Sequence, residues 1–259
     1  MTGPLATACA VELLKLRRSV IAFVVTPLIA LVVPLASYGA VWLARSPDLP
    51  GTAAAKFQPF ADGPVAVANL SVCGQILSVA VLGACGFAAA WSYGRELTGG
   101  TAGALFGHAV PRQTVALAKG LVLLAWLAGC VLVAVGLSAA LSRLGGGTFP
   151  PEAWSSAWTA LAVGWLAVGL GLPFGWVATI VRSPFATVGI LIGLVAVTQV
   201  IVVLGAGTWF PYAAPSLWAG MGGPDAAAAV PPAALLLAAA LAPAGLVVVV
   251  RAWSKLTNV

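Results

Sequence analysis

Residues that could perform catalysis are few in this sequence, and they stand apart from one another. The only histidine is His108, and it has no partner at a spacing typical of metal ligands. The four cysteines, Cys9, Cys73, Cys85 and Cys130, lie in or beside apolar segments and form no CxxC or CxxH pair. That placement is typical of small buried residues rather than of metal or redox sites. The sequence therefore predicts neither a metal ion nor a redox centre.

The motifs of nucleotide and acyl chemistry are also missing. No GxxxxGK[ST] stretch occurs, so the chain has no P-loop with which to bind ATP. Ser138, in the GLSA stretch 136–139, superficially resembles the nucleophile of an intramembrane serine protease, but that chemistry requires a base and His108 lies far away. Small residues that allow helices to pack closely explain this stretch better. We therefore expect no catalytic residue and no cofactor on this chain.

The composition indicates a membrane protein. Of the 259 residues, 61% are hydrophobic and only 7% are charged, whereas a soluble domain carries about 25% charged residues. The mean hydropathy is +1.08. The net charge of +6 arises without a basic run interleaved with aromatic residues, and the charges stand at the ends of apolar runs. This pattern indicates membrane topology and argues against nucleic acid as a partner.

We predict an all-α fold with a single transmembrane domain over residues 1–259. Residues 5–19 combine apolar residues with Glu12 and Lys15, which is typical of an interfacial helix. A signal peptide is the alternative, but the apolar run after the basic cluster is too long and no clean A-x-A site follows. At about 20 residues per crossing, six spans are predicted, at residues 20–44, 69–90, 115–142, 154–180, 186–205 and 231–250.

The distribution of Lys and Arg predicts the orientation. With both termini on one side, that side receives nine of the twelve basic residues, and the other side receives Arg45, Lys56 and Arg143. We therefore expect both termini in the cytoplasm.

Few polar side chains lie deep in the predicted spans. No Asp or Glu occurs in their cores, which disfavours a carrier driven by protons or sodium ions. Thr198 and Gln199 in the fifth span could form hydrogen bonds between helices or could contact a substrate in a pathway. Two glycine pairs, Gly171–Gly175 and Gly189–Gly193, would allow helices to approach closely.

A semi-polar, aromatic segment, residues 206–230, precedes the last span. Its prolines prevent a long helix, so we predict a partly re-entrant hairpin at the outer leaflet. The aromatic residues expected to anchor it at the interface are Trp209, Phe210, Tyr212 and Trp218.

The longest charged interruption, residues 91–119, returns the chain from the second span to the third on the cytoplasmic side. On a membrane protein without catalytic machinery, such a polar segment is most simply a docking surface, and a solvated loop is the alternative. If the segment is helical, three- and four-residue spacing places Leu97, Thr101, Leu105 and His108 on one face.

In this segment the sequence resembles the permease subunit of type-2 ABC exporters. Glu96, Gly100, Thr101, Arg112 and Lys119 match that family's E-x3-G-T motif, its Arg and the Lys entering the third span. The ELLKLRRS start and the WFPYAAPSLW stretch before the last span also resemble the family. One departure is that the family has Pro three residues before the Arg, where this chain has Ala109.

The resemblance implies a coupling helix between spans 2 and 3 that docks onto an ATPase subunit. It implies two copies of that ABC ATPase subunit, which carry ATP and magnesium, and a second or related permease copy in a bacterial plasma membrane. Exported substrates in the family include drugs, antibiotic peptides, lipids and polysaccharides. The docking residues would be Arg95, Glu96, Gly100, Thr101, Leu105, His108 and Arg112, with Arg182 as a second cytoplasmic contact. A stand-alone transporter or channel and a membrane scaffold are the alternatives.

Overall fold

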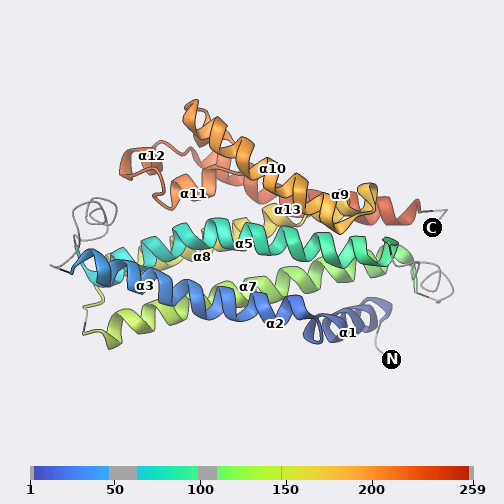
Figure 1. Cartoon of the computed structure of the whole chain (residues 1–259), viewed down its shortest axis with the longest axis horizontal. Coiled ribbons are helices and arrows are strands. Elements are labelled where there is room, and N and C mark those ends of the chain that lie inside the picture. Colours follow the sequence, from blue (N-terminus) through green and yellow to red (C-terminus); the bar gives the residue numbers. More distant parts are fainter. Residues whose placement is uncertain (1–2, 47–62, 99–109, 147, 257–259) are drawn as a thin grey trace.

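The computed structural model describes residues 3–46, 63–98, 110–146 and 148–256. Every regular element among these residues is a helix, and six helical stretches are long and apolar enough to cross a membrane. The prediction of an all-α protein with six spans is therefore confirmed. The spans run along the long axis of the molecule, and both termini lie at the same end (Figure 1). We call this the terminal end and the opposite one the far end.

The first span is one helical stretch from Val20 to Ala44, which proline divides into three parts. Pro27 ends an α-helical part and Pro34 begins another, and the turns between them are π-helical. Proline provides no backbone N–H for the helix ladder, so a locally widened turn is the expected response. The parts are α2 (Val20–Pro27), the π-helix η1 (Leu28–Val32) and α3 (Val33–Ala44).

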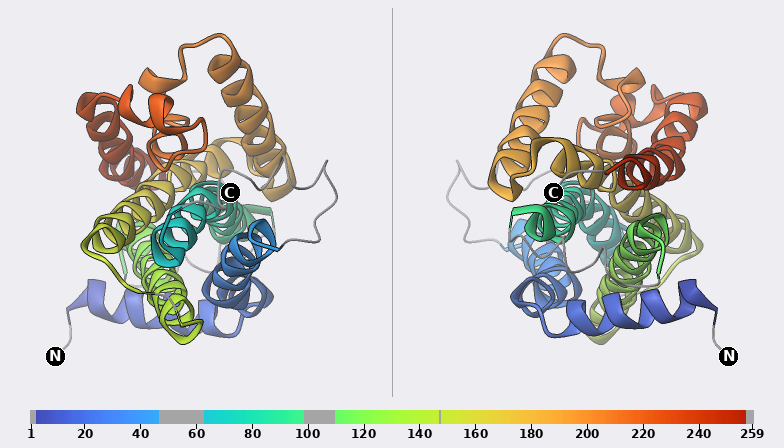
Figure 2. Two further views of the ribbon diagram at one scale, coloured as in Figure 1. Left: turned by 90° about the vertical axis from the view of Figure 1, so that its left-hand side faces the viewer. Right: turned by 90° about the vertical axis from the view of Figure 1, so that its right-hand side faces the viewer.

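Helix α1 (Pro4–Arg17) precedes this span and lies across the bundle rather than along it (Figure 2). The chain turns between the two helices at Arg18 and Ser19. The Ser19 hydroxyl caps α2 by accepting a hydrogen bond from the Ala22 N–H at 3.1 Å, as an N-cap serine does. The crosswise orientation agrees with the predicted interfacial helix.

Helix α5 (Val65–Thr98) is at the centre of the bundle and contacts α3, α7, α8, α9 and α10. Its 34 residues correspond to about 51 Å, which exceeds the hydrocarbon thickness of about 30 Å. The predicted second span ended at residue 90, but the helix continues through the charged stretch 91–98. Tyr93 and Glu96, one turn apart, are both buried, so the face of α5 that packs into the bundle extends beyond the apolar run. Tertiary contact therefore extends a helix that hydropathy alone would end.

The remaining elements complete the six spans and add three short helices at the far end (Figure 1). The fourth span is interrupted at Leu172 and Pro173. The short helices lie between the fifth span and the last one. In chain order these elements are α7 (Arg112–Leu144), α8 (Pro151–Gly171), α9 (Phe174–Val181), α10 (Pro184–Val203), the 3₁₀-helix η3 (Gly207–Trp209), α11 (Ala214–Trp218), α12 (Pro224–Ala228) and α13 (Pro232–Ser254).

Small residues and buried hydrogen bonds hold the central helices together, as expected where lipid removes the hydrophobic drive between helices. A Cβ atom added at Gly74 would lie 3.2 Å from the Ala160 Cα, and one at Gly171 would lie 2.5 Å from the Cys85 Cβ. These short distances show that α5 and α8 pack closely at both glycines. Toward the far end, the Asn69 amide donates to the Ser138 carbonyl and to the Ser142 hydroxyl, both at 2.9 Å.

The glycine pairs have different surroundings. Gly171 and Gly175 face side chains of α5, so this predicted close approach is confirmed. Gly189 and Gly193 on α10 have no atom within 4 Å of an added Cβ among the described residues. Only 17% of the apolar window of α10 is buried, against 56% for α5, so α10 is peripheral within this chain.

Candidate functional site

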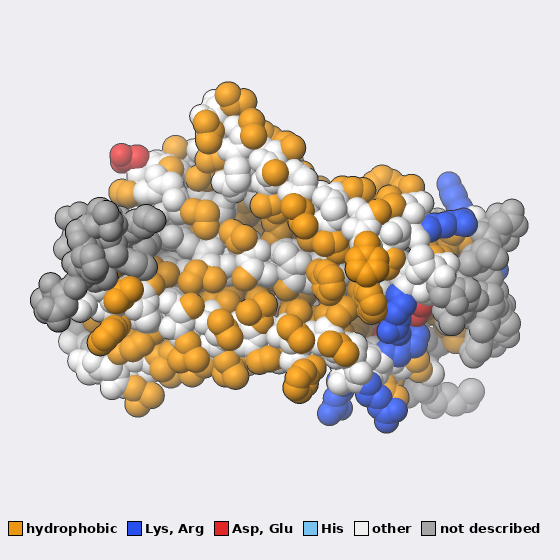
Figure 3. Space-filling model, viewed as in Figure 1, with side chains coloured by type: hydrophobic (Ala, Val, Ile, Leu, Met, Phe, Trp, Pro, Cys, Tyr) orange, Lys and Arg blue, Asp and Glu red, His pale blue; other side chains and the backbone are white. Residues whose placement is uncertain are grey.

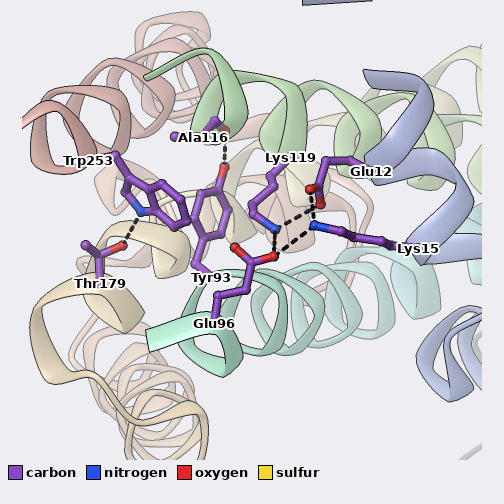
Figure 4. A network of polar contacts seen from close by, with 8 residues as sticks. All are labelled: Glu12, Lys15, Tyr93, Glu96, Ala116, Lys119, Thr179 and Trp253. Carbon is purple, nitrogen blue, oxygen red and sulfur yellow. Dashed lines mark hydrogen bonds and ion pairs between the residues drawn. The ribbon is translucent and has the colours of Figure 1, made fainter. Parts of the chain in front are cut away.

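Four charged side chains from three helices meet at the terminal end of the bundle (Figure 4). Glu12 and Lys15 lie one turn apart on α1, Glu96 is in the last turn of α5, and Lys119 is in the third turn of α7. We call these four residues the charge cluster.

The ammonium groups alternate with the carboxylates in the charge cluster. Lys119 Nζ lies 2.9 Å from Glu12 Oε2 and 2.7 Å from Glu96 Oε1. Lys15 Nζ lies 2.7 Å from Glu12 Oε1 and 3.1 Å from the same Glu96 oxygen. Each lysine therefore donates to both carboxylates, and α1 is joined to α5 and α7 through charge-assisted hydrogen bonds.

Burial makes these contacts strong and mutually dependent. The Lys119 side chain is 2% exposed and those of Glu12 and Glu96 are 7% and 8% exposed, whereas that of Lys15 is 36% exposed. Burial alone would raise the pKa of Glu12, but the charge of Lys119 and hydrogen bonds from both lysines outweigh it and lower this pKa. For Lys15, burial would lower the pKa, and its contacts with the two carboxylates raise it instead. Glu12 and Lys15 are therefore held in their ionised forms.

A set of aromatic contacts connects the same region to the other side of the bundle (Figure 4). The Tyr93 hydroxyl on α5 donates to the Ala116 carbonyl on α7 at 2.7 Å. Its ring packs edge-on against Trp253 of α13 at 5.7 Å between centroids. The Trp253 indole N–H in turn donates to the Thr179 hydroxyl of α9 at 3.0 Å. We call these contacts the aromatic brace.

Together, the charge cluster and the aromatic brace anchor the two helix ends between which residues 99–109 lie. Helix α5 ends at Thr98 and α7 begins at Arg112, and both ends are joined to α1, α9 and α13. A cavity of about 40 Å³ lies beside the charge cluster, lined in part by Lys15, Arg95 and Glu96. Ligand sites occupy about 300–1,000 Å³, so this cavity cannot hold a transported substrate. The site is suited to holding helices together and to transmitting displacement among them.

The predicted docking residues fall into three groups in the structure. Arg95 is exposed on the last turn of α5, whereas Glu96 is buried against lysines of its own chain. Arg112 is half-buried at the start of α7, and its guanidinium donates to the Leu256 carbonyl. Gly100, Thr101, Leu105 and His108 lie outside the described residues, as do residues 99–109 of the predicted coupling helix.

The predicted second contact, Arg182, is exposed at the terminal end, where α9 ends and α10 begins. Its backbone is left-handed, with φ of 52°, and its N–H donates to the Ala178 carbonyl at 2.9 Å, so it closes α9. A left-handed residue at a helix C-terminus permits the sharp reversal into the next helix.

The two residues predicted for a pathway face different surroundings on α10. Thr198 is buried and its hydroxyl donates to the Leu194 carbonyl of the same helix at 2.7 Å. Gln199 is exposed on the outside of this chain. The described residues therefore do not bring the two side chains together at one internal site.

The predicted hairpin residues lie in and around the short helices at the far end (Figure 1). Trp209 is 60% exposed, whereas Phe210, Tyr212 and Trp218 are partly buried. The Phe210 and Tyr212 rings lie 6.0 Å apart, and Phe210 and Trp218 pack against a small cluster around Leu217 and Val230.

The sequence alone does not predict the pairing in the charge cluster. Glu12 and Lys15 fit an interfacial helix and Lys119 fits a family motif, and neither pattern identifies a partner. The available signal was that Glu12 and Glu96 are isolated acids beside apolar runs, near the bilayer, where a charge is costly without a partner. Nothing in the spacing shows that both acids share Lys119.

Basic side chains gather at the terminal end of the molecule, and the surface between the two ends is largely hydrophobic (Figure 3). Among the described residues, only Arg45 and Arg143 are basic at the far end. The arrangement is that of a multi-pass membrane protein with both termini on its basic side.

Comparison with known proteins agrees with this arrangement. The sequence model of the ABC-2 family transporter protein family matches residues 8–206, which is more than half of the chain. A search of curated proteins gave no match. The matched range includes the whole charge cluster and the first five spans. The chain therefore belongs to the ABC-2 transporter family, as a non-catalytic, multi-pass permease of a family that works with an ATP-binding subunit.

Proposed function

We propose that this chain is the permease of an ABC exporter and is driven by a separate subunit that binds ATP and magnesium. Two copies of that subunit would act on two permease copies, which together form the export pathway. The substrate would be a drug, an antibiotic peptide, a lipid or a similar amphipathic molecule. The observation that carries the proposal is the bracing of both helix ends that flank residues 99–109.

A docking segment is useful only if its displacement reaches the spans. In this chain the charge cluster joins the end of α5 and the start of α7 to α1, and the aromatic brace joins them to α9 and α13. Motion imposed on residues 99–109 would therefore move several helices together. Arg95, exposed on the last turn of α5, would meet an acidic surface on the ATP-binding subunit, and Arg182 is exposed at the same end as the second cytoplasmic contact.

This mechanism requires the terminal end to be cytoplasmic, in a bacterial plasma membrane. The gathering of Lys and Arg at that end supports the orientation. A cysteine introduced at position 182 should resist an impermeant thiol reagent added to intact cells, and one at position 222 should react. The opposite result would contradict the orientation.

The decisive experiment uses the permease co-expressed with its ATP-binding subunit and reconstituted in liposomes. Gly100→Trp should block association by steric bulk, and Arg95→Glu should weaken association by reversing an exposed charge. Lys56→Ala, in the loop between the first two spans, is the control. The measurements are co-purification of the two subunits and ATP hydrolysis. If Gly100→Trp inserts normally and retains full association and hydrolysis, this segment is not the docking site.

A further inference from the structure

Two neighbouring cavities at the far end share one wall. Helices α5 and α8 and the segment around α11 and α12 enclose a cavity of about 230 Å³, the polar pocket. Helices α8 and α13 enclose a groove of about 600 Å³, the apolar groove. Trp218 of α11 lines both. In the left view of Figure 2, which faces this end, the orange-to-red helices lie beside the yellow α8, with which α11 and α13 are in contact.

The polar pocket is lined by hydroxyl groups and by no charged side chain among the described residues. Ser71 is on α5, and Ser155, Ser156 and Thr159 are on the first turns of α8. The hydroxyls of Ser155 and Ser156 donate to the Glu152 carbonyl at 2.7 and 3.2 Å, which leaves their oxygens as acceptors. Such a lining favours a neutral, hydrogen-bonding group over an ion, because a charge there would lack a counter-charge.

The apolar groove lies between α8 and α13, which both belong to stretches long and apolar enough to cross a membrane. Trp165 and Leu236 stand on its two sides, and Ala162, Gly169, Ala239 and Ala242 leave it open between the helices. The groove adjoins the polar pocket at Trp218, so the two cavities together suit an amphipathic molecule better than a helix that is apolar along its length. A flexible acyl chain can follow its length.

From these cavities we infer that the far end binds a membrane lipid with an uncharged, hydroxyl-bearing head group. The head group occupies the polar pocket, one acyl chain lies in the apolar groove, and the Trp218 ring separates the two. Indole rings favour this boundary between apolar and polar surroundings. The inference goes beyond the proposed function, because it requires only that the chain span a bilayer and not that it hydrolyse or transport anything.

The test uses the purified full chain in nanodiscs of phosphatidylcholine. The probe is a monoglucosyl diacylglycerol with a diazirine on its acyl chain, and the comparison lipid is phosphatidylglycerol with the same chain. After irradiation, labelled peptides are mapped by mass spectrometry. The glucosyl lipid should label residues 162–169 and 235–242 about fivefold more than the anionic lipid. One net hydrogen bond to the head group gives a binding preference of about this size. Residues 131–137 of α7, which include the exposed Leu132, Val133 and Gly136, should be labelled equally by both.

Variants separate the two halves of the site. Ala239→Phe fills the apolar groove and should remove most labelling there, whereas Ala140→Phe, at an exposed alanine of α7, should leave it unchanged. Thr159→Val removes a hydroxyl of the polar pocket at constant shape and should reduce the preference for the glucosyl lipid while chain labelling persists. Equal labelling of the groove and of the exposed α7 residues in the wild-type protein would overturn the inference. Equal labelling of the groove by the two lipids would also overturn the inference, and this comparison uses only the wild-type protein.

Discussion

At the scale of single residues, the sequence shows which side chains are unusual but not which of them meet. Glu96 and Lys119 are 23 residues apart and Glu12 and Lys119 are 107 apart, so their contacts depend on how α1, α5 and α7 pack. The family resemblance predicts that Glu96 faces the ATPase subunit. The structure shows it joined to two lysines of its own chain, which makes it a residue that holds the end of α5 in position.

The importance of Lys119 can be tested by removing its charge. Lys119→Met leaves two buried carboxylates facing each other, and losing one partner of a buried ion pair costs about 3–5 kcal/mol. Lys15→Met removes a 36% exposed lysine and should cost about 0–1 kcal/mol. The midpoint of thermal unfolding in detergent should therefore fall much further for Lys119→Met. Adding Glu12→Gln to Lys119→Met should recover part of the loss, and equal effects of the two lysine variants would contradict the assigned roles.

The lowered pKa of Glu12 predicts how stability depends on pH. Its ionised form is favoured by folding, so its contribution is complete above the pKa of an unfolded glutamate, about 4.3, and is lost as the pH falls through the lower folded value. Lys15, Lys119 and Glu96 are the charged groups that face it. Wild type should therefore exceed Glu12→Gln in melting temperature by a constant margin from about pH 8 to pH 5, and the margin should shrink below about pH 4.5. A margin that grows on acidification would show the opposite shift.

At the scale of elements, hydropathy and proline predicted the spans well because both act locally. The first span begins and ends where predicted, at residues 20 and 44, and its two prolines flank the π-helical turn. The end of α5 could not be predicted in the same way. The segment 91–98 reads as a polar loop, and it is helical because Tyr93 and Glu96 pack against α7, α13 and α1.

The effect of a glycine on helix packing depends on what lies opposite it in the fold. A matched pair of variants can show this dependence. An alanine at Gly171 would bring its Cβ to 2.8 Å from the Gly86 backbone nitrogen, a contact that no side-chain rotation relieves. Gly171→Ala should therefore separate α8 from α5 and cost about 1–3 kcal/mol, the usual range for overpacking. Gly136→Ala on α7, which meets nothing within 4 Å in this chain, should be neutral or slightly stabilising because alanine favours the helix. Thermal unfolding of the two purified variants measures the difference, and an equal effect would contradict the packing assigned to the α5–α8 contact.

At the scale of the whole molecule, this chain leaves much of two spans uncovered. Buried residues make up 17% of the apolar window of α10 and 22% of that of α13, whereas α5 and the fourth span exceed half. Lipid can cover such faces, but a second permease copy would do so as well. The surroundings of the glycines on α13 and α10 indicate whether lipid or a second copy covers each helix. On α13, Gly245 already faces Pro173, whereas Gly189 and Gly193 on α10 present small residues to open space.

Paired glycines one turn apart permit close approach of two helices in a bilayer. We therefore predict that α10 meets the second copy of the chain. In a variant whose four native cysteines are replaced by serine or alanine, Gly193→Cys should form a disulfide-linked dimer in membranes treated with a mild oxidant. The control is Leu132→Cys on α7, where Leu132 is 55% exposed, and this variant should remain monomeric. The two Cα atoms of a disulfide lie within about 7 Å, so cross-linking at position 193 requires the two α10 helices to touch near this glycine. If Leu132→Cys cross-links and Gly193→Cys does not, the copies meet through α7 instead, and the open glycines of α10 face lipid.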